Sequence, residues 1–187
     1  SEIQNAEDRE RYQTCFASKP GAIAAPTAGL HFTPEILDSI SSRGVEILEV
    51  TLHVGLGTFK PIEKEDIREH NMHSEYFSIS SSTLSKLQSF KKSRRPIICL
   101  GTTSVRVLET LAQNNFENNS GWTNLFIYPP YNFSMVQGLF TNFHLPKSSL
   151  LIMVSAFYGR KKLLEAYCAA VEEKYRFFSY GDCMLIL

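Results

Sequence analysis

The feature of this sequence that most constrains its fold is the alternation of short apolar runs with amphipathic helical segments. Val45–Val54 is a nearly continuous apolar run rich in β-branched residues, which is the pattern of a strand buried on both faces. Pro96–Leu100 is a second such run, and residues 125–128 and 184–187 predict two more short strands. Strands that alternate with helices predict an α/β fold, a layered domain in which helices flank a largely parallel or mixed sheet.

Helix signals separate these runs. Thr33 suits an N-cap, Pro34 suits the first helical position and Gly44 suits the C-terminal stop, so a helix is expected between them. Further helices are expected at residues 82–92, 105–113, 148–157 and 161–175. Residues 114–121 are polar and rich in asparagine, which predicts a loop.

The length, hydrophobic content and charge of the chain limit which class of protein it can be. With 187 residues, of which 43% are hydrophobic, the chain can form one core, and residues 1–187 are expected to be one domain with a charged lead-in segment at 1–20. Because 19 basic residues balance 19 acidic ones, net charge alone cannot hold a nucleic acid. The chain opens without a methionine, which indicates a piece of a longer protein.

Cysteine usage and hydropathy indicate a cytoplasmic protein. Four scattered cysteines form no C-x-x-C pair, which argues against a zinc ribbon and a disulfide framework and suits a reducing compartment. No apolar run reaches the roughly 18 residues of a membrane span, and the start lacks a signal-peptide pattern.

The histidines give the first indication of chemistry. His53 ends a predicted strand and His31 precedes a predicted helix, and such places bind ligands in α/β sheets. His70 and His73 share a predicted turn with Glu75, and His144 lies in a loop with Lys147. These imidazoles suit either proton transfer or, as an alternative, a catalytic zinc or iron site in a metal-dependent hydrolase. Hydrogen-bonded loop histidines without a catalytic role are the third possibility.

The turn from Gly101 to Arg106 gives the second indication. It joins a predicted strand to a helix, so the backbone N–H groups and hydroxyls of Thr102, Thr103 and Ser104 could bind an anion. Arg106 is predicted in the first helical turn, where its fork could hold a carboxylate or phosphate. An ordinary helix with a solvated arginine is the competing interpretation. Near the C-terminus, Arg176 and Tyr180 could stack on or hold a base of RNA, although the aromatic residues beside them also suit a core.

Six strings then resemble segments of one family. They occur in the family's order and cover nearly the whole chain: P-T-A-G-L-H-F-T (26–33), T-L-H-V-G-L-G-T-F (51–59), H-S-E-Y (73–76), G-T-T-S-V-R (101–106), T-N-F-H-L-P-K-S (141–148) and Y-R-F-F-S-Y-G-D (175–182). On these strings the sequence is similar to the S-adenosylmethionine:tRNA ribosyltransferase-isomerases of queuosine biosynthesis. Members are longer and carry a small inserted β-barrel domain that this chain lacks, so the resemblance implies the C-terminal portion of the large α/β catalytic domain.

The resemblance implies a reaction and its partners. Family members transfer and isomerise the ribosyl part of S-adenosylmethionine onto 7-aminomethyl-7-deazaguanine at the wobble position of tRNA, which gives epoxyqueuosine and releases adenine and methionine. The sulfonium acidifies the adjacent 5′ carbon, so the reaction needs groups that exchange protons near neutral pH, a task for which histidine is suited. No metal and no cofactor beyond S-adenosylmethionine is expected, nor any membrane, and a monomer is expected.

The sequence therefore assigns provisional roles. His53 and His73, supported by Glu75, are the acid/base candidates, with His31 and His144 as further catalytic candidates. Substrate binding is assigned to Thr102, Thr103, Ser104, Arg106 and Lys147, and tRNA contact to Arg176 and Tyr180. A non-catalytic RNA-binding domain of the same fold stays open as the alternative to an enzyme.

Overall fold

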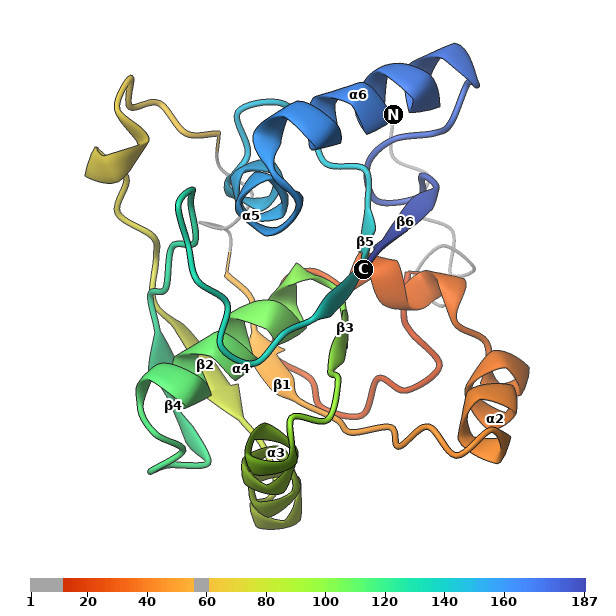
Figure 1. Cartoon of the computed structure of the whole chain (residues 1–187), viewed down its shortest axis with the longest axis vertical. Helices are drawn as coiled ribbons and strands as arrows, with labels where there is room; N and C mark the ends of the chain where they lie inside the picture. The colour runs from red at the N-terminus through yellow and green to blue at the C-terminus, as the bar shows by residue number, and fades with distance from the viewer. Residues whose placement is uncertain (1–11, 56–60) are drawn as a thin grey trace.

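Two small sheets and the helices around them make up the fold. The computed structural model describes residues 12–55 and 61–187. Within these ranges one sheet, here sheet A, contains β1 (Thr51–His53), β2 (Glu75–Ser78) and β4 (Ser120–Thr123), and sheet B contains β3 (Ile98–Leu100), β5 (Gly138–Asn142) and β6 (Cys183–Ile186). The helix α4 (Thr102–Gln113) contacts strands of both sheets (Figure 1).

The strand directions settle the kind of sheet. Sheet A is antiparallel in both of its pairs, β1 with β2 and β2 with β4. In sheet B, β3 and β5 are parallel, whereas β5 and β6 are antiparallel. The predicted α/β class is confirmed, and the arrangement is mixed rather than largely parallel. No strand in the described ranges closes either sheet into a barrel.

Local capping explains where the helices lie. The hydroxyl of Thr33 accepts from Ile36 N at the start of α2 (Pro34–Ser42), and Ser80 does the same for Thr83 N at the start of α3 (Ser81–Ser93). The hydroxyl of Ser148 accepts from Leu151 N before α5 (Ser149–Tyr158). Gly159 then separates α5 from α6 (Arg160–Glu172), which correspond to the helices expected at residues 148–157 and 161–175.

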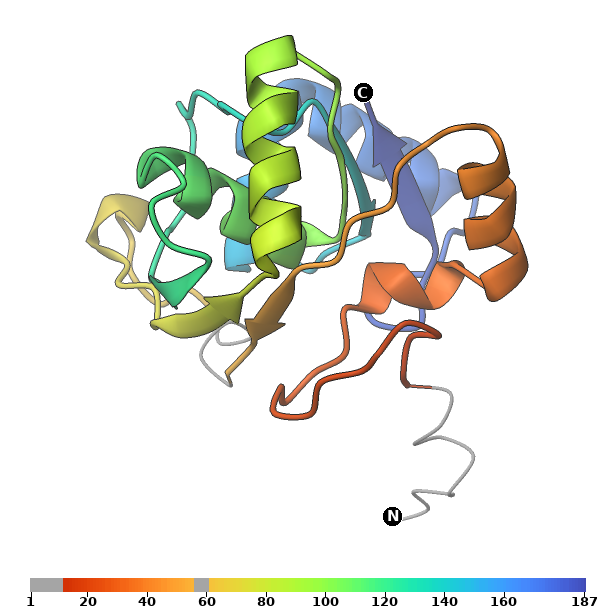
Figure 2. The same ribbon diagram turned by 90° about the horizontal axis from the view of Figure 1, so that it is seen from below.

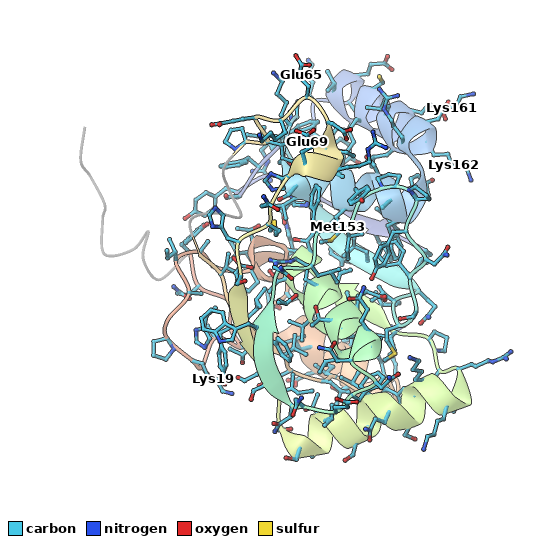
Figure 3. The ribbon with its side chains drawn as sticks, turned by 90° about the vertical axis from the view of Figure 1, so that its left-hand side faces the viewer. Lys19, Glu65, Glu69, Met153, Lys161 and Lys162 are labelled. Atoms are coloured by element: carbon cyan, nitrogen blue, oxygen red, sulfur yellow. The ribbon has the colours of Figure 1, made fainter. Side chains whose placement is uncertain are left out.

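The interior is continuous from sheet A through α4 to sheet B. Leu52 and Phe77 of sheet A, Val105 and Leu111 of α4 and Leu139 of β5 belong to one buried apolar cluster. Figure 3 shows Met153 of α5 inside the molecule, while Lys161 and Lys162 of α6 project outward. No helix in the described part of the chain is both long and apolar enough to cross a membrane.

Four predictions about strands and helices need correction. Residues 45–54 were expected to form one buried strand, but only Thr51–His53 is a strand, and Val45 and Ile47 are exposed. The reason is that β2, which pairs with β1, is only four residues long, so residues 45–50 have no strand to pair with. No strand forms at residues 125–128. The strands β2, β4 and β5 were not predicted, and β4 begins within residues 114–121, which were expected to be a loop. Finally, α4 begins at Thr102 rather than at Val105.

Two 3₁₀ turns complete the fold. The turn η1 (Thr27–His31) contacts β5, and Figure 2 shows it beside the end of sheet B. The turn η3 (Ile67–Glu69) carries Glu69 and follows Glu65 at one end of the molecule (Figure 3). Residues 21–26, which lead into η1, run from the end of β1 in sheet A to sheet B.

Candidate substrate-binding site

A pocket of about 120 Å³ lies where β5 ends. Because β3 and β5 are parallel, their carboxyl ends meet at one edge of sheet B, the place where α/β proteins bind ligands. The pocket has apolar and polar walls, made by Thr27, Pro61, Asn142, His144, Leu145, Pro146, Lys147, Ser148, Leu150, Phe178 and Ser179. Two predicted site residues, His144 and Lys147, are therefore brought together here. Asn142, Thr27 and Phe178 were not predicted.

His144 is held by two hydrogen bonds. Its Nε2 lies 2.8 Å from the hydroxyl of Thr141, and its backbone N–H donates to the phenolic oxygen of Tyr167 at 2.8 Å. Burial lowers the pKa of His144 to about 4, because the imidazolium form loses its solvation there. At neutral pH this imidazole is uncharged, so it can exchange a hydrogen bond with a ligand without adding charge to the pocket.

Asn142 is the most deeply buried polar residue of the pocket, with 1% of its surface exposed. Its Nδ2 group donates to the carbonyl oxygens of Phe178, Ser179 and Gly181 at 3.1, 3.4 and 3.5 Å. Its Oδ1 atom is buried and has no hydrogen-bond partner in the described residues. Buried polar atoms are nearly always paired, so this acceptor is an exception that needs an explanation.

Two strained backbone positions also face the pocket. Lys147 and Phe178 have φ angles of 59° and 75°, in the left-handed region that side-chain-bearing residues rarely adopt. The other residues of this kind, Arg94, Asn115, Phe116 and Lys174, follow the ends of α3, α4 and α6, where a left-handed residue commonly ends a helix. Lys147 and Phe178 end no helix, and strain of this sort gathers at functional sites.

Below sheet A, Glu75 and Arg106 form a buried ion pair. Their side chains are 1% and 2% exposed, and Arg106 Nη1 donates to Glu75 Oε2. Glu75 Oε1 also accepts from the N–H of Gly55 at 2.8 Å, and Arg106 Nε donates to the carbonyl of Leu125 at 3.2 Å. Burial lowers the pKa of Arg106, and the Glu75 carboxylate opposes that shift.

This ion pair corrects the surroundings that the sequence predicted for Glu75 and Arg106. Glu75 was expected to support His73, but its carboxylate faces Arg106, and His73 lies exposed before β2. Arg106 was expected in the first turn of a helix. It lies farther in because α4 starts at Thr102, and its guanidinium is turned toward sheet A. A substrate anion at Arg106 would have to compete with an internal carboxylate.

On the outer face of sheet A, three rings lie in a row. The strand register sets His53 opposite Tyr76 and Tyr76 opposite Trp122. The His53 and Tyr76 ring centroids are 6.1 Å apart, those of Tyr76 and Trp122 are 5.5 Å apart, and Trp122 is 69% exposed. Tyr76 and Trp122 were missed because their neighbours in space lie far away in sequence. We call His53, Tyr76 and Trp122 the ring row.

A described stretch of chain, residues 21–27, connects the ring row to the pocket. Gly21 lies so close to His53 that a Cβ atom there would be 2.7 Å from Nδ1, and the N–H of Ile23 donates to Val54 at 3.0 Å. From Ile23 the chain continues to Thr27 in the pocket wall. On the other side of residues 56–60, the N–H of Ile62 donates to the carbonyl of Lys147 at 2.9 Å.

The remaining predicted residues lie outside the pocket lining. Thr102 is buried at the start of α4, Thr103 is half-buried, and Ser104 donates to the carbonyl of Leu100 at 2.9 Å. His31 ends η1 and is half-buried. Arg176 is exposed and bonded to Asp182 at 2.8 Å, which raises the pKa of Arg176.

Tyr180 is exposed and lies 5.6 Å from the ring of Tyr12. His53, His73 and Arg106 do not line the pocket either. Part of the glycine-rich loop after His53 falls within residues 56–60, outside the described residues.

The residues of the alternative metal site do not assemble. Residues 12–55 and 61–187 contain no group of three or more His, Cys, Asp or Glu side chains that could hold a metal ion. The ring of His70 packs edge-on against Phe126 at 4.9 Å, and Glu75 is paired with Arg106. The ligand set proposed from His70, His73 and Glu75 is therefore not formed in this part of the chain.

This mixed α/β domain has a small pocket with apolar and polar walls at the carboxyl end of a sheet, the place where such folds commonly bind ligands. The chain belongs to the family of queuosine biosynthesis proteins, whose model matches residues 1–186.

Two relatives, both called S-adenosylmethionine:tRNA ribosyltransferase-isomerase, come from Sulfurihydrogenibium and Carboxydothermus hydrogenoformans. They are 56% and 54% identical over 180 and 185 residues, which is 96% and 98% of this chain.

A solved structure supports the same family. The S-adenosylmethionine tRNA ribosyltransferase of Thermotoga maritima is 43% identical, with a TM-score of 0.70 over 86% of this chain. The alignments cover 53% and 55% of the two relatives and 51% of the Thermotoga chain. This chain therefore spans about half the length of the proteins that it matches.

Proposed function

We propose that this chain provides a substrate-binding part of a tRNA ribosyltransferase-isomerase that uses S-adenosylmethionine. The enzyme would join the ribosyl part of S-adenosylmethionine to 7-aminomethyl-7-deazaguanine in tRNA, giving epoxyqueuosine and releasing adenine and methionine. The observation that carries this proposal is the identity above 50% with proteins of that name over nearly the whole chain. A cytoplasmic, monomeric protein is part of the same proposal.

The structure supports a division of this work between the two sheets. The pocket at the end of sheet B is small and concave and suits one part of a small molecule. The ring row on sheet A offers flat, partly exposed faces, on which unpaired RNA bases commonly stack. Lys19 lies on the sheet A side of the molecule in Figure 3 and adds a cation for a phosphate. We assign the tRNA contact to this face, together with Arg176 and Tyr180.

Proton transfer is assigned to His53 and His73. His53 is half-buried at the end of β1, and His73 is exposed shortly before β2, the strand that pairs with β1. Histidine is the side chain that most often acts as a general acid or base, and the removal of a proton beside the sulfonium requires such a group. His144 and Lys147 are assigned to substrate binding, because the first is uncharged at neutral pH and the second stands at the pocket wall.

The test is an assay of adenine release. The full chain is incubated with S-adenosylmethionine and tRNA carrying 7-aminomethyl-7-deazaguanine, and the tRNA nucleosides are analysed afterwards. We expect His53→Ala and His73→Ala to lower adenine release by at least about 100-fold, the usual contribution of a general acid or base, with the circular dichroism spectrum unchanged.

His70→Ala is the matched control, because His70 packs on Phe126 and is assigned no proton transfer. A rate of adenine release that is the same in the wild type and in His53→Ala would remove His53 from the mechanism.

A further inference from the structure

The peptide unit between Val54 and Gly55 is held through both of its polar atoms. The carbonyl oxygen of Val54 accepts from the N–H of Ile23 at 3.0 Å, and the N–H of Gly55 donates to Glu75 Oε1 at 2.8 Å. The two atoms belong to one planar group, so these hydrogen bonds fix its orientation. The unit comes directly after His53, the last residue of β1. We call the two hydrogen bonds the peptide clamp.

Glu75 is itself held in place by Arg106. Arg106 Nη1 donates to Glu75 Oε2, and the side chains of Arg106 and Glu75 are 2% and 1% exposed. The other carboxylate oxygen, Oε1, is the one that accepts from Gly55. Arg106 is fixed in turn by the carbonyl groups of Leu125 and Thr123, which accept from its Nε and Nη2 at 3.2 and 3.4 Å. The peptide after β1 is therefore tied to the helix α4.

Stability alone does not require a charged pair at this place. Two apolar side chains of similar volume commonly give a fold as stable as one with a buried ion pair, because no charge then loses its solvation. An apolar pair could not accept a hydrogen bond, however, and the N–H of Gly55 would lose the acceptor that the carboxylate provides. What the ion pair adds is a fixed position for the chain after His53.

Two further contacts hold the imidazole of His53. Tyr76 follows Glu75 in β2 and lies opposite His53 in the strand register, and the two rings are 6.1 Å apart with an angle of 29° between their planes. Gly21 comes two residues before Ile23, and a Cβ atom on it would lie 2.7 Å from His53 Nδ1. Because β1 has only three residues, the direction of His53 depends on such contacts at the strand end.

We propose that Glu75, held by Arg106, is a positioning residue for His53. The peptide clamp sets the direction in which the imidazole leaves the end of β1, and neither Glu75 nor Arg106 touches the substrate. This step rests on the proposed function, which assigns proton transfer to His53. A group that transfers a proton must lie within hydrogen-bond reach of its target, so a small displacement of the imidazole slows turnover. The clamp should therefore act on kcat rather than on KM.

Two double variants separate the positioning role from the charges. Glu75→Gln/Arg106→Met and Glu75→Leu/Arg106→Met each remove both charges, so neither leaves one buried charge behind. The glutamine oxygen can still accept from Gly55, whereas leucine cannot. In the adenine-release assay with the full chain, kcat should be about 10-fold lower in the leucine variant than in the glutamine variant, with KM for S-adenosylmethionine within about 2-fold. Equal kcat values, or a difference confined to KM, would overturn the proposal.

A difference in stability would act in the opposite direction. The glutamine amide brings N–H groups into the interior, so the leucine variant should be the more stable one in urea denaturation, and its lower turnover cannot then come from unfolding. Hydrogen exchange of the Gly55 amide, followed by NMR, needs no substrate. It should be about 10-fold faster in the leucine variant, the effect of one lost hydrogen bond. Equal exchange in the two variants would mean that residue 75 does not hold Gly55, which also overturns the proposal.

A second pair of variants reaches the peptide clamp without touching the buried charges. Ile23→Pro removes the N–H that donates to Val54, and Ile23→Ala keeps it. The side chain of Ile23 is 60% exposed, so both variants should fold. Ile23→Pro should lower kcat about 10-fold relative to Ile23→Ala, at similar KM. The same kcat in both variants would show that the orientation of this peptide does not govern turnover, contrary to the proposal.

The outcomes separate this inference from the proposed function. A wild-type chain that releases no adenine, although Gly55 exchange differs between the double variants, keeps the peptide clamp and loses the reaction. A wild-type chain that releases adenine, with equal kcat in the two double variants, keeps the reaction and loses the role given to Glu75.

Discussion

Glu75 and Asn142 are both buried polar residues at the end of a strand, but their side chains differ in how fully they are hydrogen-bonded. Glu75, at the start of β2, accepts from Arg106 and from the N–H of Gly55. Asn142, at the end of β5, donates through Nδ2 but has an acceptor without a partner. A buried polar group whose partners are all internal stabilises the fold. One with a remaining acceptor carries an unpaired polar atom in the interior, which is unfavourable.

The largest expected effect concerns Glu75, the buried residue of sheet A. Arg106→Leu removes the guanidinium that faces the buried Glu75 carboxylate, which should lower the free energy of unfolding by about 3–5 kcal/mol. Urea denaturation measures this change. Arg68→Leu is the control, because the Arg68–Asp66 pair is exposed and is worth at most about 1 kcal/mol. Unchanged stability of Arg106→Leu, with weakened substrate binding, would instead restore Arg106 to the substrate site.

The next effect concerns Asn142, the buried residue of sheet B. Asn142→Asp replaces the Nδ2 donor by an oxygen that faces carbonyl oxygens, which should cost about 3 kcal/mol at pH 7. Burial and the facing carbonyls favour the protonated form of the introduced carboxyl, so its folded pKa lies above its unfolded value.

The cost in Asn142→Asp should therefore shrink as pH falls through that folded pKa, because the neutral carboxyl can donate to a carbonyl. Thermal unfolding between pH 4 and pH 7 measures it. Asn119→Asp is the control, since Asn119 is half-buried and its amide makes only a 3.4 Å contact with Ser81. A loss of stability that does not depend on pH, or equal losses in Asn142→Asp and Asn119→Asp, would show that the Asn142 amide is not held by the facing carbonyl groups.

The smallest effect concerns His144. Its folded pKa of about 4 lies below the unfolded value near 6.5, so the unfolded chain binds the proton first as pH falls. The stability contributed by the neutral imidazole is present above about pH 6.5 and is lost between about pH 6.5 and pH 4.

Relative to His144→Gln, the wild type should lose about 1–2 kcal/mol over this interval, a figure reduced for partial exposure. Urea titrations at pH 4 and pH 7 measure it. The same pH dependence in both proteins would mean that His144 is charged in the folded state.

The helices were predictable because their signals are local. Thr33, Pro34 and Ser148 lie within three residues of the N–H groups that they cap or the turns that they start, so sequence alone placed α2 and α5 closely. The apolar run at 45–54 was misleading, because burial of a strand depends on a partner, and β2 is too short to reach residues 45–50.

The site was less predictable, for a physical reason that two residues illustrate. Local motifs brought out His144 and Lys147, since both lie in one loop. The buried acceptor of Asn142 depends on carbonyl groups 36 to 39 residues away, and the Glu75–Arg106 pair spans 31 residues. Such long-range partners follow from strand pairing, which the sequence pattern did not specify.

The alternation of side chains along β2 has a consequence for how this protein can change in length. Glu75 and Phe77 point inward, while Tyr76 and Ser78 point outward. Gain or loss of one residue inside β2 would exchange its two faces, moving the carboxylate into solvent and the phenol into the core. The register of β2 therefore fixes both the buried position of the Glu75 carboxylate and the surface position of the Tyr76 ring. Insertions should be tolerated in the stretch 63–72 but not in β2.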